Sequence, residues 1–490
     1  MDTPEAEQEL PDRFEAAPGD TTLPAAAADT ARYDATRWWT DYEDPALTAL
    51  VDTALAANLD LDVAQARLEE LAAQFRIARA PLFPSVDASG QANYQNIPAN
   101  TGIGGAIEGG GGGQGDGNGD EPPGDGPPQR QPADRFEFTD YQTTLGLSYE
   151  LDFWGRIRSQ RKAALNQYFA TAADLHTARL SVISQTVSTY AQIASLQRQV
   201  RLGKRTIDIL EQRLAITEDR YARGLASSFQ VFTVRQNLQS TRAEQPDLER
   251  QLYDVQSRLA TLLGRFAGKQ RALLPDSMTI PLDPSPLPAG LPSDLLMQRP
   301  DVRAAARRLE AARQQIGAAR AERLPTLSLT SQGGTQSSAL SDLVDPGQAF
   351  ANFVGQLTAP LFQGGRLRAN LSAAEARYKQ QAATYQQTVL TAFREVKASL
   401  VAYDKQRRRY REVQRQVEAS QDAFQTQRDR YERGIGDVLS LLDAERTLVQ
   451  ARTRLAGVQL AVVNARLALH RALGGSWTDA PSPDDPRLFR

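Results

Sequence analysis

The sequence predicts a mainly α-helical fold with a membrane β-barrel, built from an internal structural duplication. Three observations predict it. A Gly-Arg-x-Arg motif occurs twice at a fixed offset, two very long helical runs have seven-residue periodicity, and four short segments alternate between apolar and polar residues. Because the chain is duplicated, each copy is expected to contain the same helices and strands in the same order.

The repeated motif stands at Gly155–Arg158 and again at Gly365–Arg368, 210 positions later. The same offset joins Arg220–Gly224 to Arg430–Gly434. Matches further upstream have an offset of 241, and a Gly/Pro-rich insertion at 97–132 has room for the 31 additional residues. The chain is therefore a duplicated unit whose first copy has one inserted loop, which we interpret as long, flexible and external.

The duplication divides the chain into five parts. In each repeat we expect a helix, a strand hairpin, a long helix and a return helix, in that order. The predicted boundaries are an N-terminal extension and equatorial segment over 1–57, a first repeat over 58–264, a linker and equatorial segment over 265–299, a second repeat over 300–475 and a C-terminal tail over 476–490.

Composition excludes several classes of function. The 56 basic and 59 acidic residues give a net charge of −3, so no basic excess favours nucleic acid as a partner. Cysteine is absent, and His176 and His470 are too few for a histidine-rich metal centre, so we expect them to pack or face solvent. The sequence contains no nucleophile–base set and no nucleotide loop. We therefore expect a protein that is not an enzyme and has no cofactor.

Two helical runs of 69 residues follow the repeated motif, over 155–223 and 365–433. At 1.5 Å per residue each is roughly 100 Å long. Apolar or aromatic residues recur in them every seven positions, which is coiled-coil periodicity. In the second run this stripe consists of Val389, Val396, Tyr403, Tyr410, Val417, Phe424 and Tyr431.

Each long run ends at Tyr-x-Arg-Gly, whose glycine is expected to cap the helix and turn the chain back. Return helices are predicted over 227–263 and 437–473, with Pro246 expected to kink or loosen the first. Shorter helices are predicted over 59–80 and 300–321. A return helix is roughly 56 Å long and a shorter helix roughly 33 Å, so the two together are nearly as long as one long helix. One return helix and one shorter helix are therefore expected to stack end to end beside each long helix.

Four segments with a period of two lie between the helices, at 85–94, 144–151, 326–330 and 352–359. Apolar residues on one side and polar residues on the other fit the strands of a membrane β-barrel. An open strand edge in lipid leaves backbone groups without partners, and the smallest barrels have about eight strands. The chain is therefore expected to oligomerise, since two copies supply eight strands and three copies supply twelve.

Other conspicuous motifs have ordinary explanations. The Gly-rich insertion lacks the Gly-Lys-Ser/Thr sequence of a phosphate-binding loop, so it is interpreted as a linker. The basic cluster Arg407–Arg409 has acidic neighbours and is interpreted as a solvated helix face. The pair Trp38–Trp39, just before the first helix, is expected to be a packing anchor.

Five motifs, in the same order along the chain, resemble those of the outer-membrane factor family. They are Trp38-Trp39, Gln298–Val302, Pro360–Gly365, Tyr431-x-x-Gly434 and Leu441–Ala444. This family contains the TolC-like exit ducts, and the similarity is greatest to the OprM/NodT branch of RND-type multidrug efflux. The resemblance covers about residues 38–477. It implies a homotrimer whose twelve-stranded β-barrel is continuous with a long twelve-helix α-barrel.

The resemblance also implies a function and partners. The protein would be the outer-membrane exit duct of a tripartite efflux system, a passive channel for drugs and other small molecules. It would lie in the bacterial outer membrane, in contact with its lipid, with the helical barrel in the periplasm. Its partners would be a periplasmic adaptor (membrane fusion protein) and an inner-membrane RND-type pump. The alternatives are a type I protein-secretion duct of the same fold, or a structural coiled-coil tether, which would need no amphipathic strands.

By the same resemblance, a periplasmic gate opened by the adaptor lies on the return helix after the second tip. Matching the motif puts this gate at Leu439, Asp443 and Arg446. Asp443 and Arg446 are three positions apart and hence share one helix face, so threefold symmetry would repeat them around a narrow mouth. The equivalent positions of the first repeat hold Phe229, Thr233 and Gln236.

The two tips of the long hairpins are expected to dock the adaptor. They lie at the far end of helices about 100 Å long, as distant from the strands as the chain can reach. The predicted docking residues are Tyr221, Arg223, Gly224, Tyr431, Arg433 and Gly434.

The chain departs from the family pattern at its N-terminus. OprM-like proteins are commonly lipoproteins with an acylated N-terminal cysteine and are made with a signal peptide, and this sequence shows neither. A chain that begins after the lipidation site would explain both departures. The alternative is a member of the family without a lipid anchor.

Overall fold

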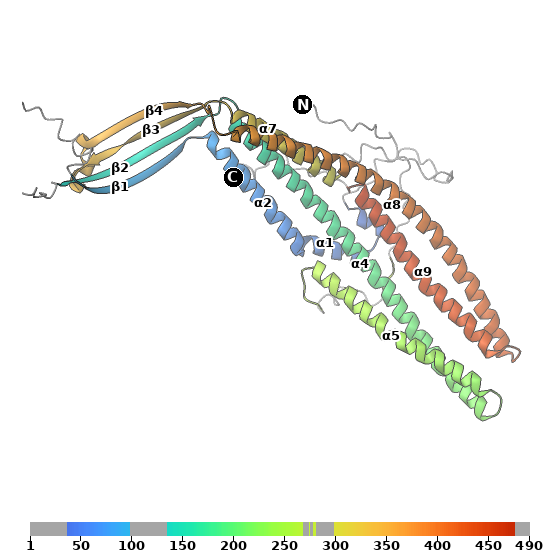
Figure 1. The fold of residues 1–490 in the computed structure, drawn as a ribbon. Helices are drawn as coiled ribbons and strands as arrows, with labels where there is room; N and C mark the ends of the chain where they lie inside the picture. The colour runs from blue at the N-terminus through green and yellow to red at the C-terminus, as the bar shows by residue number, and fades with distance from the viewer. Residues whose placement is uncertain (1–36, 99–134, 268–273, 275–277, 281–297, 476–490) are drawn as a thin grey trace, which may run out of the picture. The chain divides into compact units, whose positions relative to one another are not determined.

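A computed structural model of the protein describes residues 37–98, 135–267, 274, 278–280 and 298–475 (Figure 1). The predicted N-terminal extension up to residue 36, the Gly-rich loop from residue 99 onward, most of the predicted linker and the C-terminal tail lie outside the described residues. The chain divides into two compact units. We call them the helical unit (1–76, 162–314 and 373–490) and the sheet unit (77–161 and 315–372).

The described chain contains seven α-helices besides short 3-10 helices, and the six α-helices that the sequence predicted are confirmed to within two residues. They are α1 (Pro45–Ala57), α2 (Leu59–Arg79), α4 (Arg156–Ala222), α5 (Ser228–Leu262), α7 (Pro300–Ala321), α8 (Arg366–Glu432) and α9 (Val438–Ala472). Helix α5 continues through Pro246, so the expected loosening does not interrupt it. None of the helices in the described ranges is long and apolar enough to cross a membrane.

The return helices start where the sequence supplies capping side chains. The Ser227 hydroxyl accepts a hydrogen bond from the Gln230 N–H, and the Gln230 side chain accepts one from the Ser227 N–H, which forms a capping box. The Asp437 carboxylate accepts bonds from the Leu439 and Ser440 N–H groups at the start of α9. Each cap lies a few residues after a tip glycine, so turn and helix start are specified together.

A ladder of ion pairs fastens the first hairpin, in which α5 runs back beside α4 (Figure 1). Successive pairs are seven residues further along both helices, as expected for charged flanking positions of an antiparallel coiled coil. The pairs are Arg235 with Glu218, Arg242 with Glu211, and Lys204 with Glu249. All three are solvent-exposed, so each contributes at most about 1 kcal/mol.

The second hairpin, α8 with α9, is joined differently. The positions equivalent to Glu211, Lys204 and Glu249 hold the uncharged residues Gln421, Gln414 and Gln459. Apolar clusters lie between the two helices, as where Tyr403 contacts Val462. Arg452 of α9 donates a hydrogen bond to the side chain of Gln421 on α8. Three of the six positions of the ionic ladder thus hold glutamine in the second hairpin, and the other three hold Arg428, Glu445 and Arg452.

Short and return helices meet end to end, as the sum of their lengths predicted. At the first junction the Asn58 side chain donates to the Leu262 carbonyl at the end of α5 (2.9 Å). Its oxygen accepts from the N–H groups of Asp60 and Leu61 at the start of α2. One side chain therefore caps the C-terminus of one helix and the N-terminus of the next.

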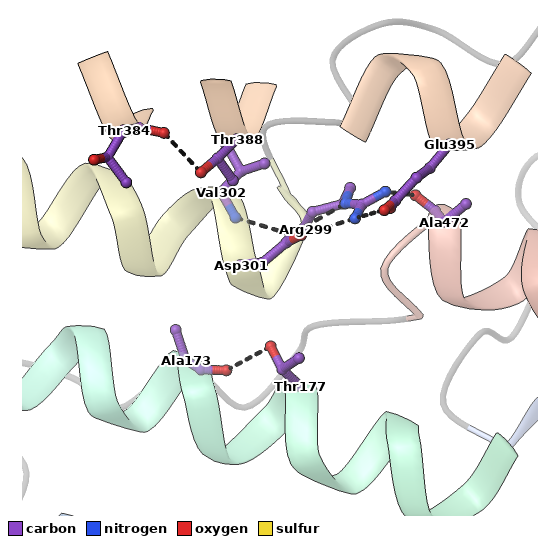
Figure 2. A network of polar contacts seen from close by, with 9 residues as sticks. All are labelled: Ala173, Thr177, Arg299, Asp301, Val302, Thr384, Thr388, Glu395 and Ala472. Carbon is purple, nitrogen blue, oxygen red and sulfur yellow. Dashed lines mark hydrogen bonds and ion pairs between the residues drawn. The ribbon is translucent and has the colours of Figure 1, made fainter. Parts of the chain in front are cut away.

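The second junction uses Arg299, which lies 241 positions after Asn58 (Figure 2). Its buried guanidinium donates to the Ala472 carbonyl at the end of α9 (2.7 Å) and pairs with Asp301 of α7 and Glu395 of α8, both at 2.8 Å. These acceptors keep the pKa of Arg299 above its usual value, although burial by itself lowers it. Both copies of the junction thus have a polar side chain that binds the end of the return helix, and the second copy adds two ion pairs.

The main core of the helical unit is built around the N-terminal tryptophans, which confirms their predicted anchoring role. Trp38 and Trp39 are almost completely buried and contact one another edge to face. The Tyr190 hydroxyl of α4 donates a 2.6 Å hydrogen bond to Asp44, which caps α1, and burial together with this carboxylate raises the pKa of Tyr190. His470 of α9 stacks on Trp38, with ring centroids 4.5 Å apart.

His470 makes the stability of the helical unit depend on pH. Burial, and secondarily the charge of Arg466, lowers its pKa from 6.5 to about 3. Between pH 6.5 and pH 3, His470 is protonated in the unfolded chain and neutral in the folded protein. The free energy of unfolding therefore decreases as the pH falls through this range, by at most ~1.4 kcal/mol per pH unit. We expect His470→Phe, which keeps the stacking, to unfold with a flatter pH dependence in thermal melts. An unchanged slope between pH 7 and 4 would contradict this.

The sheet unit contains one four-stranded antiparallel sheet in the order β1-β2-β3-β4. Its strands are β1 (Ser85–Pro98), β2 (Arg135–Leu151), β3 (Thr326–Ser337) and β4 (Ala349–Thr358). All four predicted strands are therefore confirmed, and each is longer than predicted. Within the described chain β1 and β4 are paired on one side only, so the sheet has two open edges. A Cβ atom on Gly334 would lie 1.8 Å from the Thr143 carbonyl oxygen, so only glycine fits there.

Candidate functional site

The tips of the two hairpins have the same backbone geometry, and both glycines have the cap role that the sequence predicted. Gly224 and Gly434 have φ values of 74° and 75°, which is the left-handed region. The Leu225 N–H donates to the Arg220 carbonyl, and the Ile435 N–H donates to the Arg430 carbonyl. These bonds close the last turn of each long helix in a Schellman-type motif.

The tip side chains fall into two groups. Tyr221, Arg223 and Arg433 are exposed, and Arg223 pairs with Asp219 one turn earlier (3.0 Å). Tyr431, in contrast, is half-buried against the first hairpin: its hydroxyl accepts a 2.9 Å bond from Arg220, whose guanidinium lies 5.0 Å from the ring centroid. One of the two predicted tip tyrosines therefore joins the hairpins together, while the other faces outward.

The three predicted gate residues lie on the first turns of α9. Leu439 is half-buried in an apolar cluster with residues of both hairpins, including Leu210, Leu238 and Leu442. Asp443 and Arg446 are exposed, with side-chain exposures of 66% and 68%, and form an ion pair of 2.7 Å within the helix. The structure thus brings the two charges together on one face of α9, as their spacing predicted, whereas Leu439, one turn earlier, is half-buried.

A buried ion pair between Arg213 of α4 and Glu445 of α9 was not predicted from the sequence. Its side chains are only 13% and 8% exposed. Glu445 lies two residues after Asp443 and one before Arg446, so the same helical turn presents one ion pair to solvent and a second to the other hairpin. This buried pair ties the second hairpin to the first close to the predicted gate.

A signal for this contact was present in the sequence. Helix α9 has an apolar stripe that recurs every seven residues, at Leu441, Leu448, Leu455, Val462 and Leu469. Polar residues also recur every seven positions, each four positions after a residue of this stripe, where a coiled coil normally has an apolar residue. They contact α4 and α8 alternately. Glu445 binds Arg213 of α4, Arg452 binds Gln421 of α8, Gln459 accepts from Arg198 of α4, and Arg466 donates to Tyr403 of α8.

Comparison with known proteins assigns this arrangement to a family. A sequence model of the family described as "Outer membrane efflux protein" matches residues 50–265 and 291–475. The solvent efflux pump outer membrane protein SrpC of Pseudomonas putida is 33% identical over 438 residues, which cover 89% of this chain and 87% of that protein. The outer membrane protein OprJ of Pseudomonas aeruginosa is 33% identical over 475 residues, covering 94% and 90%.

Solved structures agree in fold. The outer-membrane channel OprN superposes with a TM-score of 0.80 at 28% identity, covering 95% of this chain and 99% of that one. The Campylobacter jejuni CmeC outer membrane channel gives a TM-score of 0.80 at 25% identity, covering 92% and 91%. Both matches extend over the helical hairpins and the strands.

Two α-helical hairpins in one unit and an amphipathic four-stranded sheet in the other define a TolC-type channel of the outer membrane. The chain belongs to the outer membrane efflux protein family. It is accordingly an outer-membrane efflux channel and not an enzyme, as the sequence predicted. A coiled-coil tether is no longer an alternative, because the family is one of channels.

Proposed function

We propose that the protein is the exit duct of a tripartite efflux system and works as a homotrimer. The observation that carries the proposal is the sheet, which is open at β1 and β4 in a protein of the outer membrane. Unpaired backbone groups at such edges cost several kcal/mol each in lipid. Three copies supply twelve strands, so pairing β4 of one copy with β1 of the next would remove every edge.

The duct is passive and depends on partners for energy. We propose an inner-membrane pump of the RND type and a periplasmic adaptor, because relatives such as SrpC are named as the outer membrane proteins of efflux pumps. The proposed cargo is drugs, solvents and other small molecules, in keeping with relatives named for solvent, toluene and antibiotic efflux. Protein secretion by the same fold would instead be supported by export of an unfolded polypeptide.

We place the periplasmic gate at Leu439, Asp443 and Arg446. The ion pair within α9 uses Oδ1 of Asp443 and Nη2 of Arg446, and this exposed pair would offer its remaining oxygen and N–H groups to a neighbouring copy. Leu439 would narrow the mouth. Exposed pairs of this kind contribute only about 0.2–1 kcal/mol each, which suits a closure that a partner protein must reverse.

The second hairpin is the better candidate for a moving part. Three of its six positions equivalent to the ionic ladder hold uncharged glutamines, and its links to the first hairpin include Glu445 with Arg213 and Tyr431 with Arg220. We propose that opening breaks these links while the ladder keeps α4 and α5 together.

The proposed function is tested on the purified protein in detergent and in planar bilayers. Native mass spectrometry is expected to give three copies per particle, and the reconstituted protein is expected to form channels of low conductance. Expression in a host that lacks its own duct, together with a matching adaptor and pump, is expected to restore drug resistance. A stable monomer, or a duct that exports no drug, would overturn the proposal.

The tips are proposed as the adaptor-docking surface, and the two glycines give a direct test. A β-branched side chain at φ near 75° is strained by at least about 1–2 kcal/mol, although there is open space beside both glycines. We therefore expect Gly224→Val with Gly434→Val to lower drug resistance in cells while the trimer persists. Gly457→Val, in the interior of α9, also has open space and serves as the control. Resistance equal to that of the control would argue against docking at the tips.

A further inference from the structure

The four junctions between strands and helices lie at one end of the sheet. The antiparallel register brings the start of β1 beside the end of β2 (Ser85 opposite Ser148), the end of β2 beside the start of β3 (Leu151 opposite Leu327) and the start of β3 beside the end of β4 (Thr326 opposite Thr358). In a channel of the outer membrane, this end is where the strands leave the lipid on the periplasmic side.

The junction between β4 and α8 places exposed apolar side chains next to two arginines. Leu361 and Phe362 are 95% and 90% exposed. Arg366 and Arg368 begin α8 and are exposed as well. The sequence from residue 346 to residue 374 contains no aspartate or glutamate, so no carboxylate of this stretch compensates the two guanidinium groups.

The duplication supplies a comparison within the same chain. At the junction between β2 and α4, Arg156 pairs with Glu150 (2.7 Å) and Arg158 pairs with Asp152 (3.2 Å). The corresponding arginines of the second repeat are Arg366 and Arg368. The positions equivalent to the two carboxylates, 210 residues later, hold Pro360 and Phe362. The second copy has kept both positive charges and has an apolar residue in place of each negative one.

We propose that the β4–α8 junction, defined by Leu361, Phe362, Arg366 and Arg368, binds an anionic phospholipid. The two guanidinium groups would hold the phosphate through charge-assisted hydrogen bonds. Leu361 and Phe362 would lie against the acyl chains at the membrane interface, where aromatic side chains are favoured. The exposed Phe353 and Leu357 of β4 continue this apolar surface along the strand. The proposal rests on the outer-membrane location of the family and is independent of the gate.

The test measures lipid retained by the intact, detergent-solubilised protein in native mass spectra. Phosphatidylglycerol and phosphatidylcholine with identical acyl chains are added in separate titrations, and phosphatidylglycerol is expected to be retained preferentially. Arg366→Gln with Arg368→Gln is expected to weaken its retention by about 10- to 30-fold, the effect of two basic residues at an anionic membrane surface. Arg409→Gln with Arg411→Gln, two exposed arginines elsewhere on α8, is the control and should have no effect.

A second variant keeps both arginines. Phe362→Asp places a carboxylate where the first repeat has Asp152, and it is expected to abolish the preference for phosphatidylglycerol by neutralising Arg368. Inorganic phosphate at equal ionic strength should not displace the lipid, because it cannot occupy the apolar part of the site. Equal retention of the two lipids by the parent protein would overturn the proposal. So would retention that survives both sets of substitutions, or displacement by inorganic phosphate, which would identify a simple anion site.

Discussion

Glu445→Ala is expected to destabilise the helical unit by about 3–5 kcal/mol, because it leaves the Arg213 charge buried without its partner. The pair is 13% and 8% exposed and joins α4 to α9, so the same substitution should loosen the second hairpin from the first. We therefore expect helical circular dichroism to be lost at a lower temperature, and single channels to open more often in planar bilayers.

Two controls separate the buried charge from general damage. Arg235→Ala removes a pair of the exposed ladder and should cost less than about 1 kcal/mol. Arg213→Met combined with Glu445→Leu removes both charges, and apolar replacement of a buried pair is often neutral or stabilising. This double variant should recover stability. If Glu445→Ala melts like the parent protein, the buried pair is not what joins the two hairpins.

Asp443→Ala combined with Arg446→Ala is expected to raise the open fraction of the reconstituted channel by roughly 3- to 100-fold. This range follows from three symmetric copies of an exposed pair that contributes about 0.2–1 kcal/mol each. Cells with this variant should become more sensitive to large antibiotics such as vancomycin. High salt should partly reproduce the effect in the parent protein, since exposed charges are screened.

The first repeat offers a matched control for the gate. Thr233→Ala with Gln236→Ala changes the positions equivalent to Asp443 and Arg446 and should leave conductance unchanged. Stability should be similar in both double variants, because Gln236, Asp443 and Arg446 are exposed and Thr233 is only partly buried. A conductance no greater than that of this control would place the gate elsewhere.

The helices and strands could be predicted from short-range sequence signals. Heptad stripes, capping residues and tip glycines gave the helix boundaries to within two residues, because these signals act over one or two turns. The alternating segments predicted all four strands, although their outer ends were missed where the alternation is weak. Helix α5 continues through Pro246, and whether this proline kinks or loosens the helix stays a prediction.

The contacts between hairpins could not be predicted in the same way. Asp443 and Arg446 were placed correctly on one helix face because they are three positions apart, whereas Glu445 was missed because its partner Arg213 is 232 positions away. Glu445, Arg452, Gln459 and Arg466 are seven residues apart and hence form a polar stripe on α9. This spacing identifies the stripe but not the residues that it contacts. Tyr431 was likewise assigned to an exposed tip, and its contact with Arg220 depends on how the two hairpins pack.

The sequence alone therefore determined the duplication, the helices and strands, the tip turns and the membership of a channel family, since each depends on local patterning or on motifs in order. Only the tertiary structure decided which charges are buried and which are exposed. The distinction matters because Asp443 faces solvent, whereas Glu445, two residues further along α9, contacts the first hairpin. Burial changes the energetic consequence of removing its partner from less than about 1 kcal/mol to several.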